Sequence, residues 1–177
     1  FGWVWGASTS AASVSVAGGA DGVFPVSVES ESAGDIRAVR ISPDGTRALV
    51  IRGNDSSAWV GVVERGPAGR PQAVRSLTQV SLERGTVIDG SWTTSTGLAL
   101  VVREAGSADD QLITLPLGGL PSSVSLPVRV RTMSAGASSS SIVITGTDDA
   151  GKTQVLIRSG ALWQNVPEPL SSARYAG

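Results

Sequence analysis

The sequence contains neither cysteine nor histidine among its 177 residues. Without cysteine the chain has no disulfide framework, no thiolate nucleophile and no thiolate metal ligand. Without histidine it lacks the usual general base, the usual partner of a nucleophilic serine and the commonest metal ligand. These absences narrow the possible chemistry, and on the sequence as a whole we expect no cofactor, no metal site, no catalytic residues and no enzymatic activity.

Charged residues and long apolar runs are also scarce. Lys and Arg number 14 against 15 Asp and Glu, a net charge of −1, which indicates neither a nucleic-acid partner nor an anionic membrane surface. No apolar run approaches the ~18 residues of a membrane span, and no basic segment before an apolar one marks a signal peptide. The chain opens on Phe1-Gly2-Trp3-Val4-Trp5, which resembles the middle of a strand, so we expect a piece of a longer protein.

Residues 39–51 are the most informative stretch and predict a strand, a tight structural turn and a second strand. In the turn Ser42-Pro43-Asp44-Gly45, Pro43 sets φ at the first corner and Asp44 can accept a backbone hydrogen bond. Gly45 supplies the positive φ that closes the hairpin. The second strand, 48–51, is apolar without alternation, which is typical of a strand covered on both faces.

This pattern recurs at a period of ~40–50 residues. Similar unalternating runs occur at 98–102 and 142–144. First strands are expected at 36–41, 86–91 and 128–133, and third strands at 58–63, 111–115 and 153–157. The spacing predicts blades at 34–83, 84–126 and 127–177, the last with a C-terminal tail. Residues 1–33 are expected to hold the tail of a preceding blade and an inter-blade loop.

Four-stranded antiparallel units with doubly covered inner strands favour an all-β fold almost without helix. The prediction is a partial β-propeller of about three and a half to four blades. A two-sheet sandwich is the alternative, because it also uses many short strands. A sandwich would make the second strands alternate between apolar and polar residues, and they do not alternate.

Acidic residues recur in the turns between second and third strands. A four-stranded meander places these turns at one end of each sheet, so they would gather on one face of the propeller. The acidic face defined in this way consists of Asp55, Asp109, Asp110, Asp148 and Asp149, with Glu29, Glu31 and Asp35 of an inter-blade loop beside them. Such a face suits a basic patch on a protein partner and would steer its approach. The alternative is that Asp is simply a favoured turn residue.

The same acids have two chemical alternatives. Paired carboxylates are Ca²⁺ ligands, but the spacing of a calcium-binding loop is missing. Asp109 with Asp110, or Glu29 with Glu31, would be the carboxylate pair of a glycosidase, although nothing in the sequence sets them ~5–10 Å apart across a pocket. The serine run 138–141 has no histidine to activate it and predicts a polar hairpin loop.

Three tryptophans divide into two kinds. Trp3 and Trp59 take matching places in third strands and are expected to pack between sheets. Trp92 breaks the repeat and falls in an expected turn region, so it is the aromatic side chain that we expect to anchor a partner. Four arginines fall on innermost strands, where they either pair with acids of neighbouring blades or line a central channel. They are Arg37, Arg40, Arg129 and Arg131.

Residues 36–48, with 2–5, 160–163 and 173–177, resemble the C-terminal propeller region of the actinobacterial lipoprotein family LpqB. The stretch 42–47 is similar to the blade signature of TolB-like and WD-like periplasmic propellers. The resemblance covers essentially the whole chain. It implies a secreted, lipid-anchored protein whose precursor carries a signal peptide, a lipidated cysteine and a GerMN-type domain. It also implies a partner, the extracytoplasmic part of the sensor kinase MtrB in the MtrA–MtrB two-component system, and it implies no catalytic motif.

From these observations we expect a non-catalytic, extracytoplasmic protein-interaction module that modulates signalling by a sensor kinase. One alternative is a carboxylate-dependent hydrolase built on a propeller, which a deep pocket with converging acids would favour. Another is a purely structural set of blades that completes a larger ring, which exposed apolar edges would favour.

Overall fold

The computed structural model of the chain describes residues 11–17, 23–29, 36–53, 56–67, 69–82, 85–135, 141–159 and 162–166. Within these ranges every regular element is a β-strand. The strands in chain order are β1 (Ala11–Ala17), β2 (Val23–Glu29), β3 (Ile36–Ile41), β4 (Arg47–Arg52), β5 (Ala58–Arg65), β6 (Pro71–Gln79), β7 (Thr86–Thr94), β8 (Gly97–Arg103), β9 (Asp110–Pro116), β10 (Ser122–Leu126), β11 (Arg129–Ala135), β12 (Ser141–Thr147), β13 (Thr153–Ser159) and β14 (Leu162–Asn165).

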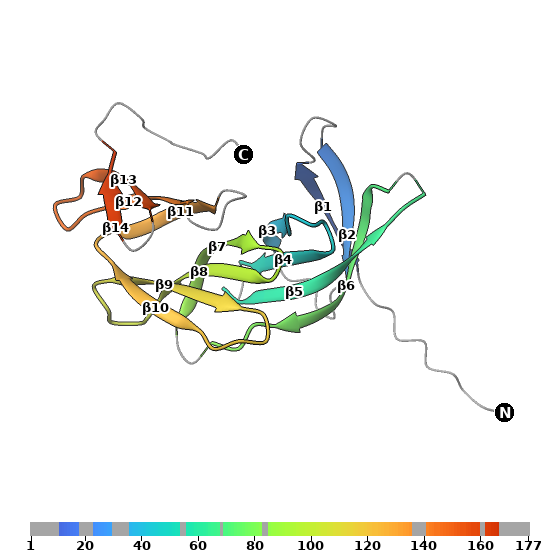
Figure 1. The fold of residues 1–177 in the computed structure, drawn as a ribbon, viewed down its shortest axis with the longest axis horizontal. Helices are drawn as coiled ribbons and strands as arrows, with labels where there is room; N and C mark the ends of the chain where they lie inside the picture. The colour runs from blue at the N-terminus through green and yellow to red at the C-terminus, as the bar shows by residue number, and fades with distance from the viewer. Residues whose placement is uncertain are drawn as a thin grey trace.

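Three consecutive antiparallel meanders make up most of the molecule, and we refer to them as blade 1 (β3–β6), blade 2 (β7–β10) and blade 3 (β11–β14). Their first strands lie toward the middle of the molecule, as Figure 1 shows. Neighbouring blades pack face to face through shared apolar clusters, one between blades 1 and 2 and one between blades 2 and 3. This arrangement confirms the predicted all-β, partial propeller.

The second strands of blades 1 and 2 are covered on both faces, as their composition predicts, whereas β12 of blade 3 contributes one face, with Ile142 and Ile144, to an apolar cluster. In β8, Leu98, Leu100 and Val102 contribute to the cluster with blade 1, whereas Ala99 and Val101 contribute to the cluster with blade 3. All five side chains are at most 1% exposed. A strand between two neighbouring blades has no wet face, so both sets of alternate side chains must be apolar.

The first strand of each blade carries a bulge at the same position. One extra residue interrupts the pairing with the second strand at Arg37 in β3, at Ile88 in β7 and at Arg131 in β11. A bulge increases the local twist of a strand and turns the side chains that follow it. The three blades therefore share this bulge as well as their strand order, and the apolar pattern of the sequence does not reveal the bulge.

The turn between β3 and β4 is built by the four residues singled out in the sequence. Gly45 has a φ of 69°, and its N–H donates to the Ser42 carbonyl at 2.8 Å. The Asp44 carboxylate accepts the Ser42 hydroxyl at 2.6 Å and the Thr46 N–H at 3.1 Å. These bonds, above all the one from Ser42, hold the pKa of Asp44 below its ordinary value. Pro43 is exposed, and the Gly45 carbonyl accepts a hydrogen bond from the Arg65 side chain of β5 at 3.0 Å.

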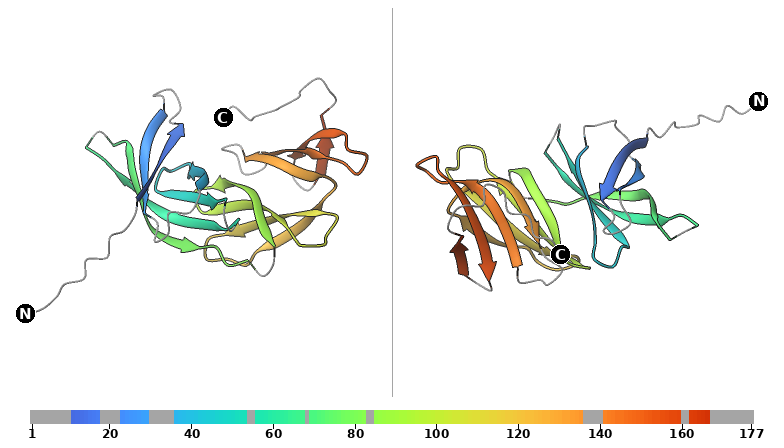
Figure 2. Two further views of the ribbon diagram at one scale, coloured as in Figure 1. Left: turned by 180° about the vertical axis from the view of Figure 1, so that it is seen from behind. Right: turned by 90° about the horizontal axis from the view of Figure 1, so that it is seen from above.

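Residues 23–29 form a strand where the sequence analysis expects an inter-blade loop, and that expectation is wrong for this segment. β2 pairs with β1 and also lies parallel to β6, with Ser27 opposite Ala73 and Val28 opposite Val74. Val26 and Val28 are fully buried in a cluster with β4. Figure 2 shows the β1–β2 hairpin at the far end of the molecule from blade 3. The hairpin covers the face of blade 1 that blade 2 leaves open. This need for a cover arises from the packing of the blades, so the local sequence of residues 23–29 does not reveal it.

Candidate functional site

The turns that carry the predicted acids lie at one end of blades 2 and 3. Thr86 at the start of β7 pairs with Arg103 at the end of β8, and Arg129 at the start of β11 pairs with Thr147 at the end of β12. The β8–β9 and β12–β13 turns therefore lie at the end where these first strands begin. A cavity of about 830 Å³ opens here, lined by residues 85–86, 103–108 and 129.

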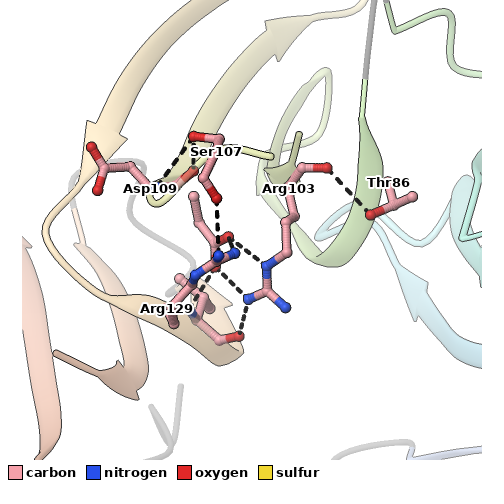
Figure 3. Close-up of polar contacts among 7 residues, drawn as sticks. Thr86, Arg103, Ser107, Asp109 and Arg129 are labelled. Carbon is pink, nitrogen blue, oxygen red and sulfur yellow. Dashed lines mark hydrogen bonds and ion pairs between the residues drawn. The ribbon is translucent and has the colours of Figure 1, made fainter. Parts of the chain in front are cut away.

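Asp110 lies beneath this cavity with its side chain fully buried. Arg103 donates from Nε to one carboxylate oxygen and from Nη2 to the other, both at 2.7 Å. The Val130 N–H of blade 3 donates to the same carboxylate at 2.7 Å, and Arg129 Nη1 lies 3.6 Å from it. Figure 3 shows the Arg103 and Arg129 side chains extending toward each other. A planar guanidinium fork matched to a carboxylate is the strongest common form of ion pair.

Opposing influences act on the pKa of Asp110. Burial is the largest of them and raises the pKa, but the hydrogen bonds from Arg103 and Val130 and the charges of Arg103 and Arg129 lower it. The net pKa lies below the ordinary value, so the group stays ionised. The same hydrogen bond raises the pKa of Arg103.

Asp110 and its partners Arg103, Arg129 and Val130 join blade 2 to blade 3. Arg103 also donates to the Val130 carbonyl at 3.3 Å, and Arg129 donates to the Ser107 carbonyl at 2.9 Å. Because the Asp110 carboxylate is buried and neutralised, it has no surface to offer to a partner. The expectation that Asp110 belongs to the acidic face is therefore wrong.

The other described members of the acidic face lie in turns. Asp109 and Asp149 are exposed, and Figure 3 shows the Asp109 carboxylate turned away from Arg103 and Arg129. Asp148 is half-buried and accepts hydrogen bonds from the Gln154 side chain and the Lys152 and Ala150 N–H groups. These bonds, led by that from Gln154, hold the pKa of Asp148 below its ordinary value. Asp55, Glu31, Asp35 and the Glu29 side chain lie outside the described residues.

A second buried carboxylate, Asp89, joins all three blades, and sequence reasoning missed it. Its Oδ1 accepts from Arg40 Nη2 of blade 1 and its Oδ2 from the Met133 N–H of blade 3, each at 2.8 Å. Arg40 Nη1 donates to the Met133 carbonyl, also at 2.8 Å. Arg40 thus follows the expectation that inner-strand arginines pair with acids of neighbouring blades. An acid inside an otherwise neutral first strand, 86–91, was the available signal for Asp89.

Trp92 lies within β7 and not in a turn, and its side chain is 4% exposed. Its indole N–H donates to the Arg40 carbonyl at 2.8 Å, which adds a further bond between blades 1 and 2. A side chain in this position has no surface to present, so the expectation that Trp92 anchors a partner is wrong. The indole of Trp59 is half-buried beneath the Arg52 guanidinium, 4.5 Å from the ring centroid. Trp3 lies outside the described residues.

Among the described residues, no three acidic side chains are grouped so that they could hold a metal ion. Within the same ranges, no helix is long and apolar enough to cross a membrane.

Comparisons with known proteins place these features in a family. The family described as "Lipoprotein LpqB beta-propeller domain" matches residues 1–174. No curated protein matches the sequence. Similar solved structures include Pyrococcus horikoshii acylaminoacyl peptidase, at 15% identity and a TM-score of 0.50, over 82% of this chain and 28% of that one. They also include Kluyvelomyces marxianus Hsv2, at 15% identity and a TM-score of 0.46, over 75% of this chain and 42% of that one.

The chain spans less than half the length of both solved structures. At 15% identity the likeness to the peptidase concerns the fold alone.

Proposed function

Because the chain belongs to the LpqB lipoprotein β-propeller family, we propose that it is a non-catalytic protein-interaction module of an LpqB-like lipoprotein. It acts outside the cytoplasm, in a protein that is lipid-anchored to the cell membrane. Its partner is the extracytoplasmic domain of a sensor histidine kinase, MtrB of the MtrA–MtrB two-component system, whose signalling it modulates.

The observation that supports this proposal most directly is that some acids of blades 2 and 3 are buried in ion pairs, whereas others are exposed in turns. Asp110 and Asp89 are buried and bound by arginines, so they hold the blades together. Asp109 and Asp149 stay exposed in equivalent turns of adjacent blades. Two carboxylates on one end of a rigid pair of blades suit a basic patch, and they contribute more to the rate of encounter than to affinity.

The hydrolase alternative has less support. A general acid needs a pKa raised toward neutrality, which burial without a cationic partner provides. The cavity is lined by one acid, Glu104, which has no second carboxylate beside it in the lining. Asp110 lies beneath the lining, and the net shift of its pKa is downward. This carboxylate therefore suits a structural ion pair better than proton transfer.

A binding titration tests the proposal. The chain and the full-length soluble protein are each titrated with the isolated extracytoplasmic domain of the sensor kinase at low and at physiological salt. We expect salt-sensitive binding by both proteins, because exposed charges act over about a Debye length, ~10 Å at 0.1 M salt. Binding by the full-length protein alone would contradict the proposal for this chain.

A charge reversal locates the contact. We expect the double variant Asp109→Lys, Asp149→Lys to slow association about tenfold at low salt, because like charges then face each other. Glu64→Lys is the matched control, since Glu64 is an exposed acid near the β5–β6 turn at the opposite end of blade 1. Unchanged binding of the double variant would show that these carboxylates take no part.

A further inference from the structure

The outer edges of the three blades differ in how they are protected. The outer strand of blade 1, β6, is covered by β2 in parallel pairing. The outer strand of blade 3, β14, is only four residues long. The outer strand of blade 2, β10, has five residues, and among the described residues no strand pairs with its free edge. Figure 1 shows β10 at the outside of its sheet.

β10 also lacks the devices that normally keep an edge strand from pairing. Proteins protect such edges with charged side chains, with prolines inside the strand or with bulges. From residue 117 to residue 128 the sequence has no charged residue, and its prolines, Pro121 and Pro127, flank β10 without interrupting it. The pairing of β10 with β9 runs through all five residues without a register shift. The first four residues of β10 are exposed, and Val124 among them is 43% exposed.

The chain itself shows that an outer blade edge can take an additional strand. β2 comes from outside the blade 1 meander, and it pairs with the edge of β6 that corresponds to the free edge of β10. On β6 the added strand is covalently part of the molecule. Among the described residues no strand takes the equivalent place beside β10.

We propose that β10 pairs in antiparallel orientation with β10 of a second copy of this chain, across a two-fold axis. A strand that pairs with itself in this way forms an isologous contact, in which each side chain meets a partner from the same strand. Most surface strands resist such pairing because their own charges then lie opposite each other. β10 carries none. A register centred on Val124 sets Val124 opposite its copy and Ser123 opposite Ser125, so at the three central positions apolar meets apolar and hydroxyl meets hydroxyl. At the ends of the strand Ser122 lies opposite Leu126, whose side chain is turned into its own blade and is 1% exposed.

Charge placed at Val124 tests the pairing. Sedimentation velocity follows the association of the unmodified chain and of the variants Val124→Lys and Val124→Glu up to about 1 mM, a range that includes weak dimers. We expect a dimer for the unmodified chain and an association at least about tenfold weaker for either variant, because like charges then meet at the axis. An equimolar mixture of the two variants is expected to associate again, since opposite charges then meet.

Val62→Glu is the matched control. Val62 is also an exposed valine, at 53%, but it lies in β5, which has a partner strand on each side. Its neighbours across the strands, Arg47 and Arg75, accommodate a carboxylate. We expect this variant to associate like the unmodified chain, and thermal melts establish that every variant is folded.

A disulfide cross-link provides a second measurement. Because the chain has no cysteine, Val124→Cys introduces a single thiol. Directly opposite Cβ atoms in an antiparallel pair lie ~4.5–5.5 Å apart, close enough for a disulfide after a small adjustment. Mild oxidation is expected to give a covalent dimer with Val124→Cys and not with Val62→Cys.

Three outcomes would overturn the proposal. The unmodified chain stays monomeric throughout the concentration range, Val62→Glu and Val124→Glu weaken association equally, or the mixture of Lys and Glu variants fails to associate. If the chain is monomeric while Val124→Glu loses binding to the sensor-kinase domain, the edge pairs with an extended segment of another protein. The salt-sensitive titration with the Asp109 and Asp149 variants is independent of all these results.

Discussion

Two neighbouring residues, Asp109 and Asp110, show how differently the same side chain is used in one turn. Asp109 ends the turn with its carboxylate in water, whereas Asp110 begins β9 with its carboxylate inside the contact between blades 2 and 3. Asp110 accepts hydrogen bonds from Arg103 and from the Val130 N–H, so its removal would leave buried donors unpaired.

We expect Asp110→Asn to lower the free energy of unfolding by about 3 kcal/mol at pH 7, the lower end of the range for breaking a buried ion pair. The lower end applies because the side chains of Arg103 and Arg129 are 34% and 42% exposed. Urea denaturation measures the change. Asp109→Asn, one residue away, is the control and should stay within ~0.5 kcal/mol of the unmodified chain.

The contribution of Asp110 depends on pH with a defined sign. The folded-state pKa is lowered, so the stabilisation is fully present above the ordinary value of 3.8 and is lost as the pH falls through the folded-state pKa. The stability difference between the unmodified chain and Asp110→Asn should therefore be constant from pH 5 to pH 7 and shrink below pH ~4. A difference that grows on acidification would contradict the ion pair.

At the scale of the element, the second strand of each blade is the main source of apolar burial. β8 supplies side chains to both apolar clusters, and β4 and β12 take equivalent places in their own blades. Six of the seven residues of β8 are buried, whereas the outer strand β10 has four exposed residues. The contribution of a strand to apolar burial thus depends on its position within the blade.

Leu100→Ala in β8 is expected to cost about 3 kcal/mol or more, because the side chain is fully buried and its removal leaves a cavity between blades 1 and 2. The same substitution at Leu120, which is 89% exposed, should cost less than ~0.5 kcal/mol. Thermal and urea denaturation of the two variants give the comparison. Similar costs at both positions would show that burial between the blades is not what stabilises β8.

For the whole molecule, polar contacts complement the apolar clusters in holding the blades together. Arg40, Asp89 and the Met133 backbone lie on the first strands of blades 1, 2 and 3, and each of them is bound to the other two. Trp92 adds its bond to the Arg40 carbonyl. These directional bonds join the first strands of the three blades in addition to the apolar packing between them.

We expect Arg40→Met to destabilise the chain by roughly 2–3 kcal/mol, because it leaves the buried Asp89 carboxylate without its cation. A double-mutant cycle with Asp89→Asn should give a coupling energy of about 1 kcal/mol or more, within the usual range for residues in contact. Arg47→Met is the control, since Arg47 reaches Ser95 of blade 2 only at 3.4 Å and lies 3.9 Å from Asp44. Additive effects of Arg40→Met and Asp89→Asn would contradict their direct interaction.

The local pattern of the sequence was sufficient to predict the repeat, the doubly covered second strands and the turn position, and from these the propeller. Each of these features depends on neighbouring residues: an unalternating apolar run, a Pro-Asp-Gly corner and their regular spacing. The absence of histidine and cysteine likewise limits the chemistry of the chain through its composition alone.

The tertiary structure alone decided which acids face water and which strands pair outside the repeat. Asp109 and Asp110 are indistinguishable in sequence, and only the fold brings Arg103 of β8 and the Val130 N–H of the next blade to Asp110. Trp92 and Asp89 gain their roles from Arg40, about 50 residues away, and β2 gains its role from β6. Contacts between blades join residues far apart in the chain, so no local pattern carries them.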